Sequence, residues 1–295
     1  MKILIVFFYC LSALATDFPE GELAKILKID SDSGIRGPAY AKIVEELKLL
    51  QDSYPEYASL VNYGTTIGGK PLSLIKIHRK SIPATEAIYI GGSIHGDEYL
   101  NIEDRLPRWF LEQTASSGVI TSFLNQGGVI YIAPILNPDG YDRRERENRN
   151  GVDLNRDYTV REANIQGFKQ PETRALVEYL SRDLGATQLK VAMDYHCCIG
   201  ALLYPWSFKG PVLSQLDLQR HLLISNIMQG SIGSQIRAGT TPIILGYSAK
   251  GTSKDFYFEH FGAAGFTYEG RRGKENKFFE EHTLMWEGIL QSMLR

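Results

Sequence analysis

Two side chains that can bind a metal ion stand three residues apart in the segment HGDE, namely His95 and Glu98. They follow residues 87–91 (AIYIG), an apolar run that predicts a buried strand. Zinc accepts imidazole nitrogen and carboxylate oxygen, and a catalytic zinc site has three protein ligands and one position left for water. His196 is the best candidate for the third ligand, because it too follows an apolar strand, expected at residues 189–194.

The remaining histidines fit this role less well, because they precede a loop, lie on a predicted helix or lie in polar helical contexts: His78, His221, His260 and His282. A single H-x-x-E pair often arises by chance, and a histidine at a strand end is often a hydrogen-bonded structural residue. The metal hypothesis therefore depends on the elements that would bring these side chains together.

Those elements alternate between apolar strands and amphipathic helices. Strands are expected at 61–66, 72–78, 87–91, 129–135, 189–194 and 264–268, and helices at 38–50, 102–114, 171–182, 213–228 and 280–294. Strands that are apolar throughout and alternate with helices predict an α/β fold, a single domain with a mixed, mostly parallel twisted sheet and helices on both faces. The polar clusters come just after strand ends, the edge at which open α/β sheets bind ligands.

The composition limits the class of protein. Hydrophobic residues make up 43% of the 295 residues and charged residues 22%, which supports a packed core and excludes wholesale disorder. Lys and Arg total 32 and Asp and Glu total 34, a formal charge of −2. This balance argues against a surface dedicated to nucleic acid, which needs clustered excess basic charge.

The N-terminus has the pattern of a secretory signal peptide at residues 1–15 (MKILIVFFYCLSALA): a basic start at Lys2, an apolar run, and Ala13-Leu14-Ala15 as a cleavage site. A short membrane anchor is the alternative. No later segment has the roughly 18 apolar residues of a spanning helix, so no stable membrane insertion is expected after cleavage. We therefore expect a secreted or periplasmic protein.

Two further expectations concern the mature chain. Residues 16–37 form a short N-terminal segment, which is too short to fold as an inhibitory domain. Cys197 and Cys198 are the two cysteines left after cleavage, and we expect them to be small buried thiols.

Six motifs occur in order along the rest of the chain: HGDE (95–98), NPDGY (137–141), RENR and GVDLNR (146–149 and 151–156), His196 followed by LLYPW, GYSAKGTSKD (246–255), and FTYEGR (266–271). In order and approximate spacing they resemble the zinc metallocarboxypeptidases of the carboxypeptidase A type. The resemblance extends from about residue 38 to the C-terminus and implies one catalytic domain, 38–295, with one Zn²⁺ per chain.

The resemblance implies roles around the metal. His95, Glu98 and His196 correspond to the three zinc ligands. Asp153 corresponds to a carboxylate that contacts His95 and fixes its tautomer. Glu269 corresponds to the general base that deprotonates the zinc-bound water and later protonates the leaving amine.

The resemblance also implies roles in holding the substrate. Asn155 and Arg156 correspond to the pair that holds the terminal carboxylate, for which a planar guanidinium is well suited. Tyr247 corresponds to a mobile tyrosine that covers the bound residue. Arg149 corresponds to the arginine that polarises the scissile carbonyl, and Arg146 is expected along the path by which the carboxylate approaches.

Specificity is expected to depend on Lys254, which the resemblance puts at the base of the pocket for the C-terminal side chain. A buried ammonium there favours an anionic partner, so we expect a preference for acidic C-terminal residues. Ser207 and Thr267 correspond to further pocket positions. The alternative is that the Lys254 ammonium extends to solvent.

The sequence therefore predicts a secreted, monomeric zinc carboxypeptidase that acts on peptides. Three alternatives remain open: an amidase of cell-wall peptides on the same fold, a deacylase of N-acyl amino acids, and a catalytically inactive binding module. One departure from the family pattern is Asp97, which stands where the digestive members carry an arginine.

Overall fold

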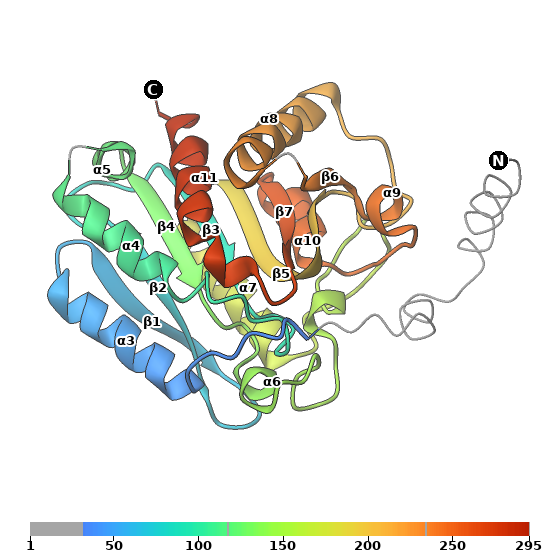
Figure 1. Cartoon of the computed structure of the whole chain (residues 1–295), viewed down its shortest axis with the longest axis horizontal. Coiled ribbons are helices and arrows are strands. Elements are labelled where there is room, and N and C mark those ends of the chain that lie inside the picture. The colour runs from blue at the N-terminus through green and yellow to red at the C-terminus, as the bar shows by residue number, and fades with distance from the viewer. Residues whose placement is uncertain (1–31, 117, 234, 295) are drawn as a thin grey trace, which may run out of the picture.

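The computed structural model of the protein describes residues 32–116, 118–233 and 235–294 (Figure 1). The expected signal peptide, residues 1–15, and most of the segment 16–37 lie outside the described residues. Among the helices that the structure describes, none combines the length and the apolar character needed to cross a bilayer.

A seven-stranded sheet forms the centre of the fold, with the strand order β1-β2-β4-β3-β5-β6 and with β7 paired to β5. Its strands are β1 (Ala58–Thr65), β2 (Pro71–His78), β3 (Glu86–Gly91), β4 (Gly128–Ala133), β5 (Gln188–Tyr204), β6 (Arg237–Thr240) and β7 (Ala264–Arg271). The pairs β1·β2 and β2·β4 are antiparallel, and β3 pairs in parallel with both β4 and β5. The predicted mixed, mostly parallel sheet is confirmed.

The strand β5 is much longer than the expected 189–194, and it turns back on itself. Gly200, at the turn, has a φ of +63°, a left-handed conformation that glycine adopts without steric cost. Before the turn, β5 runs parallel to β7, and His196 lies opposite Glu269. After the turn, β5 runs in the opposite direction along β7, and Ala201 lies opposite Glu269. The two arms of β5 therefore flank β7, and the turn between them lies beside Glu269.

Helices cover both faces of the sheet, as expected from strands that are apolar throughout (Figure 1). The helices of seven or more residues are α3 (Tyr40–Ser53), α4 (Leu106–Glu112), α5 (Val119–Asn125), α7 (Pro171–Leu184), α8 (Gln215–Ile232), α10 (Ser253–Phe261) and α11 (Phe279–Gln291). In β3, Ile88 and Ile90 belong to the core that α3, α4, α5, α8 and α11 complete. Ala87 and Tyr89 point the other way, into the core that α7 and α10 complete.

Short helices lie in the connections between the longer elements. They are η1 (Gln113–Ala115), α6 (Pro138–Arg143), η2 (Leu154–Arg156), α9 (Thr241–Leu245) and η3 (Glu275–Lys277). Two of them begin at side-chain caps, because Asn137 accepts a hydrogen bond from the backbone N–H of Gly140 and Asp153 accepts one from that of Asn155. These caps fix the loops that carry the NPDGY and GVDLNR motifs.

Candidate metal centre and active site

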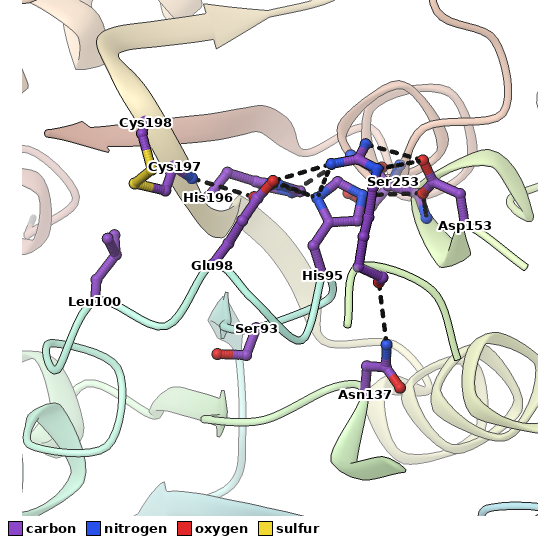
Figure 2. Close-up of polar contacts among 12 residues, drawn as sticks. Ser93, His95, Glu98, Leu100, Asn137, Asp153, His196, Cys197, Cys198 and Ser253 are labelled. Atoms are coloured by element: carbon purple, nitrogen blue, oxygen red, sulfur yellow. Dashed lines mark hydrogen bonds and ion pairs between the residues drawn. A yellow bond between two sulfur atoms is a disulfide. The ribbon is translucent and has the colours of Figure 1, made fainter. Parts of the chain in front are cut away.

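His95, Glu98 and His196 meet at the carboxyl edge of the sheet (Figure 2). The first two lie in the loop after β3, the third lies on β5, and these parallel neighbours pair up to Gly91 and Asp194. One ligand atom from each residue lies within 4.8 Å of the others. Both imidazoles present Nδ1, which lies 2.9 Å from a Glu98 oxygen in each case, and the two Nδ1 atoms are 3.2 Å apart.

The donor set and its spacing fit zinc. Zinc binds two imidazole nitrogens and a carboxylate oxygen at roughly 2.0–2.2 Å, so atoms this close together can bind one ion. All three side chains are buried, with at most 3% of each exposed. Burial and the charge of Arg146 act to lower the pKa of His95, but Glu98 and Asp153 outweigh them and raise it to about 9. The same negative field favours a divalent cation.

The outer nitrogens of the imidazoles have partners of their own. His95 Nε2 lies 2.9 Å from Asp153 Oδ1, a contact that orients the ring so that Nδ1 faces Glu98. His196 Nε2 lies 3.3 Å from the side-chain amide of Asn155. The backbone N–H of Cys197 donates to Glu98 Oε2 over 3.2 Å, which anchors the carboxylate to β5.

A further carboxyl group that we did not single out shapes the ligand loop. Glu103 is fully buried and accepts hydrogen bonds from Ser93 Oγ (3.2 Å) and from the backbone N–H groups of Leu100 (3.3 Å) and Ile102 (3.1 Å). These bonds close the loop around Glu98. Glu103 lies among the polar residues that follow the HGDE motif, and this position is the sequence feature that could have indicated its role.

The two arginines of the RENR segment occupy different environments. Arg146 Nη1 lies 3.0 Å from Glu98 Oε1 and 3.1 Å from His95 Nδ1, and its Nη2 donates to Asp153 Oδ2 over 2.9 Å. Arg149 is exposed and makes no hydrogen bond or ion pair with the described residues. The structure therefore brings Arg146, and not Arg149, to the metal ligands, and the role of Arg149 at the scissile bond stays a prediction.

The pair Asn155 and Arg156 lies on η2, directly after Asp153. Asn155 is 6% exposed, and its Oδ1 accepts a hydrogen bond from the Ser253 backbone N–H over 3.0 Å. Arg156 is half-buried and donates from Nη1 to Asn155 O over 2.8 Å. Within the described residues its guanidinium makes no other hydrogen bond, so the remaining N–H groups are available to a ligand.

Glu269 ends the apolar part of β7 and stands opposite His196 in the strand register. Burial, together with repulsion from Glu98, raises the pKa of Glu269 to about 8. Burial also raises the pKa of the Tyr247 hydroxyl. The charge of Arg156 acts to lower this pKa, and the charge of Glu269 acts to raise it. Tyr247 therefore lies within electrostatic reach of both groups.

Lys254 is 1% exposed, which excludes the alternative that its ammonium extends to solvent. Its Nζ donates to Ser207 Oγ and lies 3.1 Å from Asp255 Oδ1. Burial lowers the pKa of Lys254, and Asp255 opposes that effect. Thr267, the third expected pocket residue, is buried on β7 opposite Leu203 of β5, and no hydrogen bond joins it to Lys254 among the described residues.

The expectation of two free thiols is wrong. The structure joins Cys197 and Cys198 in a disulfide between neighbouring residues, directly after the ligand His196 (Figure 2). Cys197 is buried and Cys198 is half-buried. The bond lies just before Gly200, at the turn between the two arms of β5.

Comparison with known proteins identifies relatives of this chain. The profile of the family described as zinc carboxypeptidase matches residues 43–286. Human mast cell carboxypeptidase A is 26% identical over 201 residues, 57% of this chain and 47% of that protein. Carboxypeptidase SOL1 of Arabidopsis thaliana is 27% identical over 253 residues, 80% of this chain and 50% of that protein. The chain spans about half the length of these curated relatives.

Solved structures show the same fold. Thrombin activatable fibrinolysis inhibitor superimposes with a TM-score of 0.73 at 21% identity, covering 86% of this chain and 73% of that one. Carboxypeptidase A of Helicoverpa armigera gives 0.71 at 19% identity, covering 92% and 78%. Because the family profile spans most of the sequence and the His-Glu-His cluster suits the metal of that family, the chain belongs to the zinc carboxypeptidase family.

Proposed function

We propose that the protein is a secreted zinc carboxypeptidase that hydrolyses the C-terminal peptide bond of peptides. One observation carries the proposal: the ligand set His95, Glu98 and His196 is complete, and Glu269 stands opposite His196 on the adjacent strand. The N-terminal pattern of residues 1–15 supports secretion.

Glu269 is the proposed general base. Zinc, when bound by the three ligands, supplies a Lewis acid that polarises a carbonyl and lowers the pKa of a bound water. Glu269 accepts the proton of the attacking water and delivers it to the nitrogen of the leaving amine. A nearby divalent cation stabilises the Glu269 carboxylate and so opposes the rise in its pKa.

Asn155 and Arg156 are proposed to hold the terminal carboxylate of the substrate. The Arg156 guanidinium uses one N–H on Asn155 O and keeps the rest of its planar donor set for a second acceptor. A carboxylate accepts two such parallel bonds, which fixes its position and orientation. Tyr247, whose hydroxyl is influenced by the charges of Arg156 and Glu269, is proposed to cover the bound residue.

Arg146, in place of Arg149, is proposed to stabilise the oxyanion. Its Nη1 lies against His95 Nδ1 and Glu98 Oε1, the atoms that form the candidate metal site. Two further bonds to Asp153 hold the guanidinium there, so its charge is pre-positioned where negative charge develops on the carbonyl oxygen.

Lys254 supports a preference for acidic C-terminal residues. An ammonium has three N–H donors, and the described residues supply two acceptors, Ser207 Oγ and Asp255 Oδ1. We propose that the third N–H donates to a carboxylate on the side chain of the C-terminal residue.

The test is hydrolysis of blocked dipeptides that end in Glu, Phe or Lys, with and without a zinc chelator. We expect release of the C-terminal residue, loss of activity on chelation, and recovery with zinc. Glu269→Gln should retain the fold and lose activity by several orders of magnitude, whereas an unchanged rate would exclude Glu269 as the base. Hydrolysis of muropeptides but not of ordinary peptides would instead identify a cell-wall amidase.

A further inference from the structure

A chain of buried hydrogen bonds connects helix α11 to the two strands that carry His196 and Glu269. Trp286 Nε1 lies 3.1 Å from Tyr195 Oη, which lies 3.1 Å from His282 Nδ1. His282 Nε2 lies 2.8 Å from Glu275 Oε1. All four side chains are fully buried, and the proposed reaction uses none of them.

The donor and acceptor of each hydrogen bond in this series can be assigned. The indole of Trp286 can only donate, so the Tyr195 oxygen accepts from it and the Tyr195 hydroxyl donates to His282 Nδ1. His282 then carries its proton on Nε2 and donates to Glu275. This requires a neutral imidazole, and burial lowers the pKa of His282 accordingly.

The carboxylate of Glu275 is held by β7 as well. Tyr268 Oη donates to Oε1 over 2.7 Å, and the backbone N–H of Arg271 donates to Oε2 over 2.7 Å. The Arg271 guanidinium adds a bond of 3.0 Å and neutralises the charge. Every polar side-chain atom of Trp286, Tyr195, His282, Glu275 and Tyr268 thus has a partner, as a buried polar cluster requires.

The network is attached one residue before each of two functional residues. Tyr195 precedes His196 on β5, Tyr268 precedes Glu269 on β7, and the two tyrosines are opposite each other in the register, as His196 and Glu269 are. Neighbouring residues of a strand point to opposite faces. The tyrosines therefore belong to the core under α11, whereas His196 and Glu269 belong to the site.

We propose that Tyr195, His282, Glu275 and Tyr268 are positioning residues that fix β5 against β7 and so fix His196 relative to Glu269. A purely apolar contact has no preferred direction and tolerates small displacements of one strand along the other. Hydrogen bonds of 2.7–3.1 Å tolerate much less, because they weaken steeply with distance and angle. The inference rests on the roles of His196 and Glu269 in the proposed function.

The test compares Tyr195→Phe with Tyr131→Phe. Tyr131 is also buried in the sheet and donates to Asp183 over 2.6 Å, but it lies on β4, away from the site. Both variants lose one buried hydroxyl, so both should lower the melting temperature. Tyr195→Phe alone should lower kcat, by roughly tenfold, with KM within about twofold, because a displacement below 1 Å misaligns the reacting groups.

A second readout does not depend on turnover. With Co²⁺ in place of zinc, the visible spectrum reports the geometry at His196, and it should change in Tyr195→Phe but not in Tyr131→Phe. His282→Gln, which can still accept from Tyr195 and donate to Glu275, should retain more of kcat than His282→Leu.

The outcomes separate the two proposals. Equal kcat and identical Co²⁺ spectra in Tyr195→Phe and Tyr131→Phe would overturn the positioning role, even if both variants have lowered melting temperatures. If the wild-type protein shows no carboxypeptidase activity, the proposed function fails, but the spectra still decide whether the network positions His196. If Tyr195→Phe fails to fold, Tyr268→Phe gives the same comparison, since Glu275 keeps four other donors.

Discussion

Replacing Lys254 by methionine should weaken or remove the proposed preference for acidic C-terminal residues. Methionine is also unbranched and fills similar space, but it has no charge and no N–H donor. The Lys254 side chain is 1% exposed and so is shielded from bulk water. The substitution therefore isolates the contribution of one buried ammonium.

The size of the effect follows from the donor count. Two of the three N–H groups are used on Ser207 and Asp255, which leaves one for the substrate. A hydrogen bond to a charged group contributes roughly 1.5–3 kcal/mol, or about 10- to 150-fold in kcat/KM. The ratio of kcat/KM for a Glu-ended over a Phe-ended blocked dipeptide should fall by that factor in Lys254→Met.

The stability of the variant needs its own control. Asp255 is 0% exposed and would lose its cationic partner, and breaking a buried ion pair costs about 3–5 kcal/mol. Its two oxygens would still accept the backbone N–H of Ser207 at 3.1 and 2.9 Å. The double variant Lys254→Met with Asp255→Asn should recover most of the melting temperature and show the same fall in the Glu-to-Phe ratio.

Initial rates on both substrates are measured with the same protein sample, so a reduced folded fraction cancels from the ratio. An unchanged Glu-to-Phe ratio in a folded Lys254→Met sample would refute the reasoning. Lys254 would then serve only as the partner of Asp255, and specificity would lie elsewhere.

Three more outcomes follow from the site and its surroundings. Arg146→Met should lower kcat/KM by about 100-fold or more, whereas Arg149→Met should stay within about twofold; equal effects would contradict the assignment. Removal of zinc should lower the melting temperature as well as the activity, since free zinc at 100 times its Kd stabilises the fold by about 2.7 kcal/mol. Burial opposes ionisation of Glu275, but His282 and Arg271 outweigh it and lower the pKa from 4.5 to about 2. Glu275 therefore stabilises the fold above about pH 5, and about 3 kcal/mol is lost as the pH falls from 4.5 toward 2. Urea unfolding between pH 3 and 7 should show a flatter acid limb in Glu275→Gln.

The metal ligands could be predicted because simple patterns determine where they lie. The segments before His95 and His196 are apolar throughout, as expected of strands buried on both faces, and parallel strands bring their carboxyl ends to one edge. The helix boundaries were less accurate: the expected helix 102–114 is the shorter α4, preceded by a turn region that Glu103 holds. There a tertiary hydrogen bond overrides local preference.

The choice between Arg146 and Arg149 could not be made from residue type or spacing. Both lie in a polar loop without periodicity, and its course is set by contacts far from the arginines. Arg144 adopts a left-handed backbone with φ of +57°, and the Asn148 side chain donates to Gln170 and Glu172 at the start of α7. These contacts turn Arg146 inward, and no local sequence signal encodes them.

The sequence analysis assigns His282 to a predicted helix at 280–294 without a role for its ring, and α11 (Phe279–Gln291) is close to that prediction. The missed signal is its place in the apolar stripe of α11, because His282, Met285, Trp286 and Ile289 share the 3–4 residue spacing of one buried face. A histidine within such a stripe needs buried partners for both ring nitrogens. Those partners come from β5 and from the segment after β7, which a pattern within the helix cannot reveal.

The register of β5 against β7 therefore serves two purposes at once. Because side chains alternate along a strand, a shift of one residue would turn His196 toward α11 and bring Tyr195 to the metal site. Apolar residues on both faces of these strands would tolerate that shift, since either set could be buried. The directional bonds from Tyr195 and Tyr268 to His282 and Glu275 can form in only one register, so the polar core under α11 selects the alignment on which the metal centre depends.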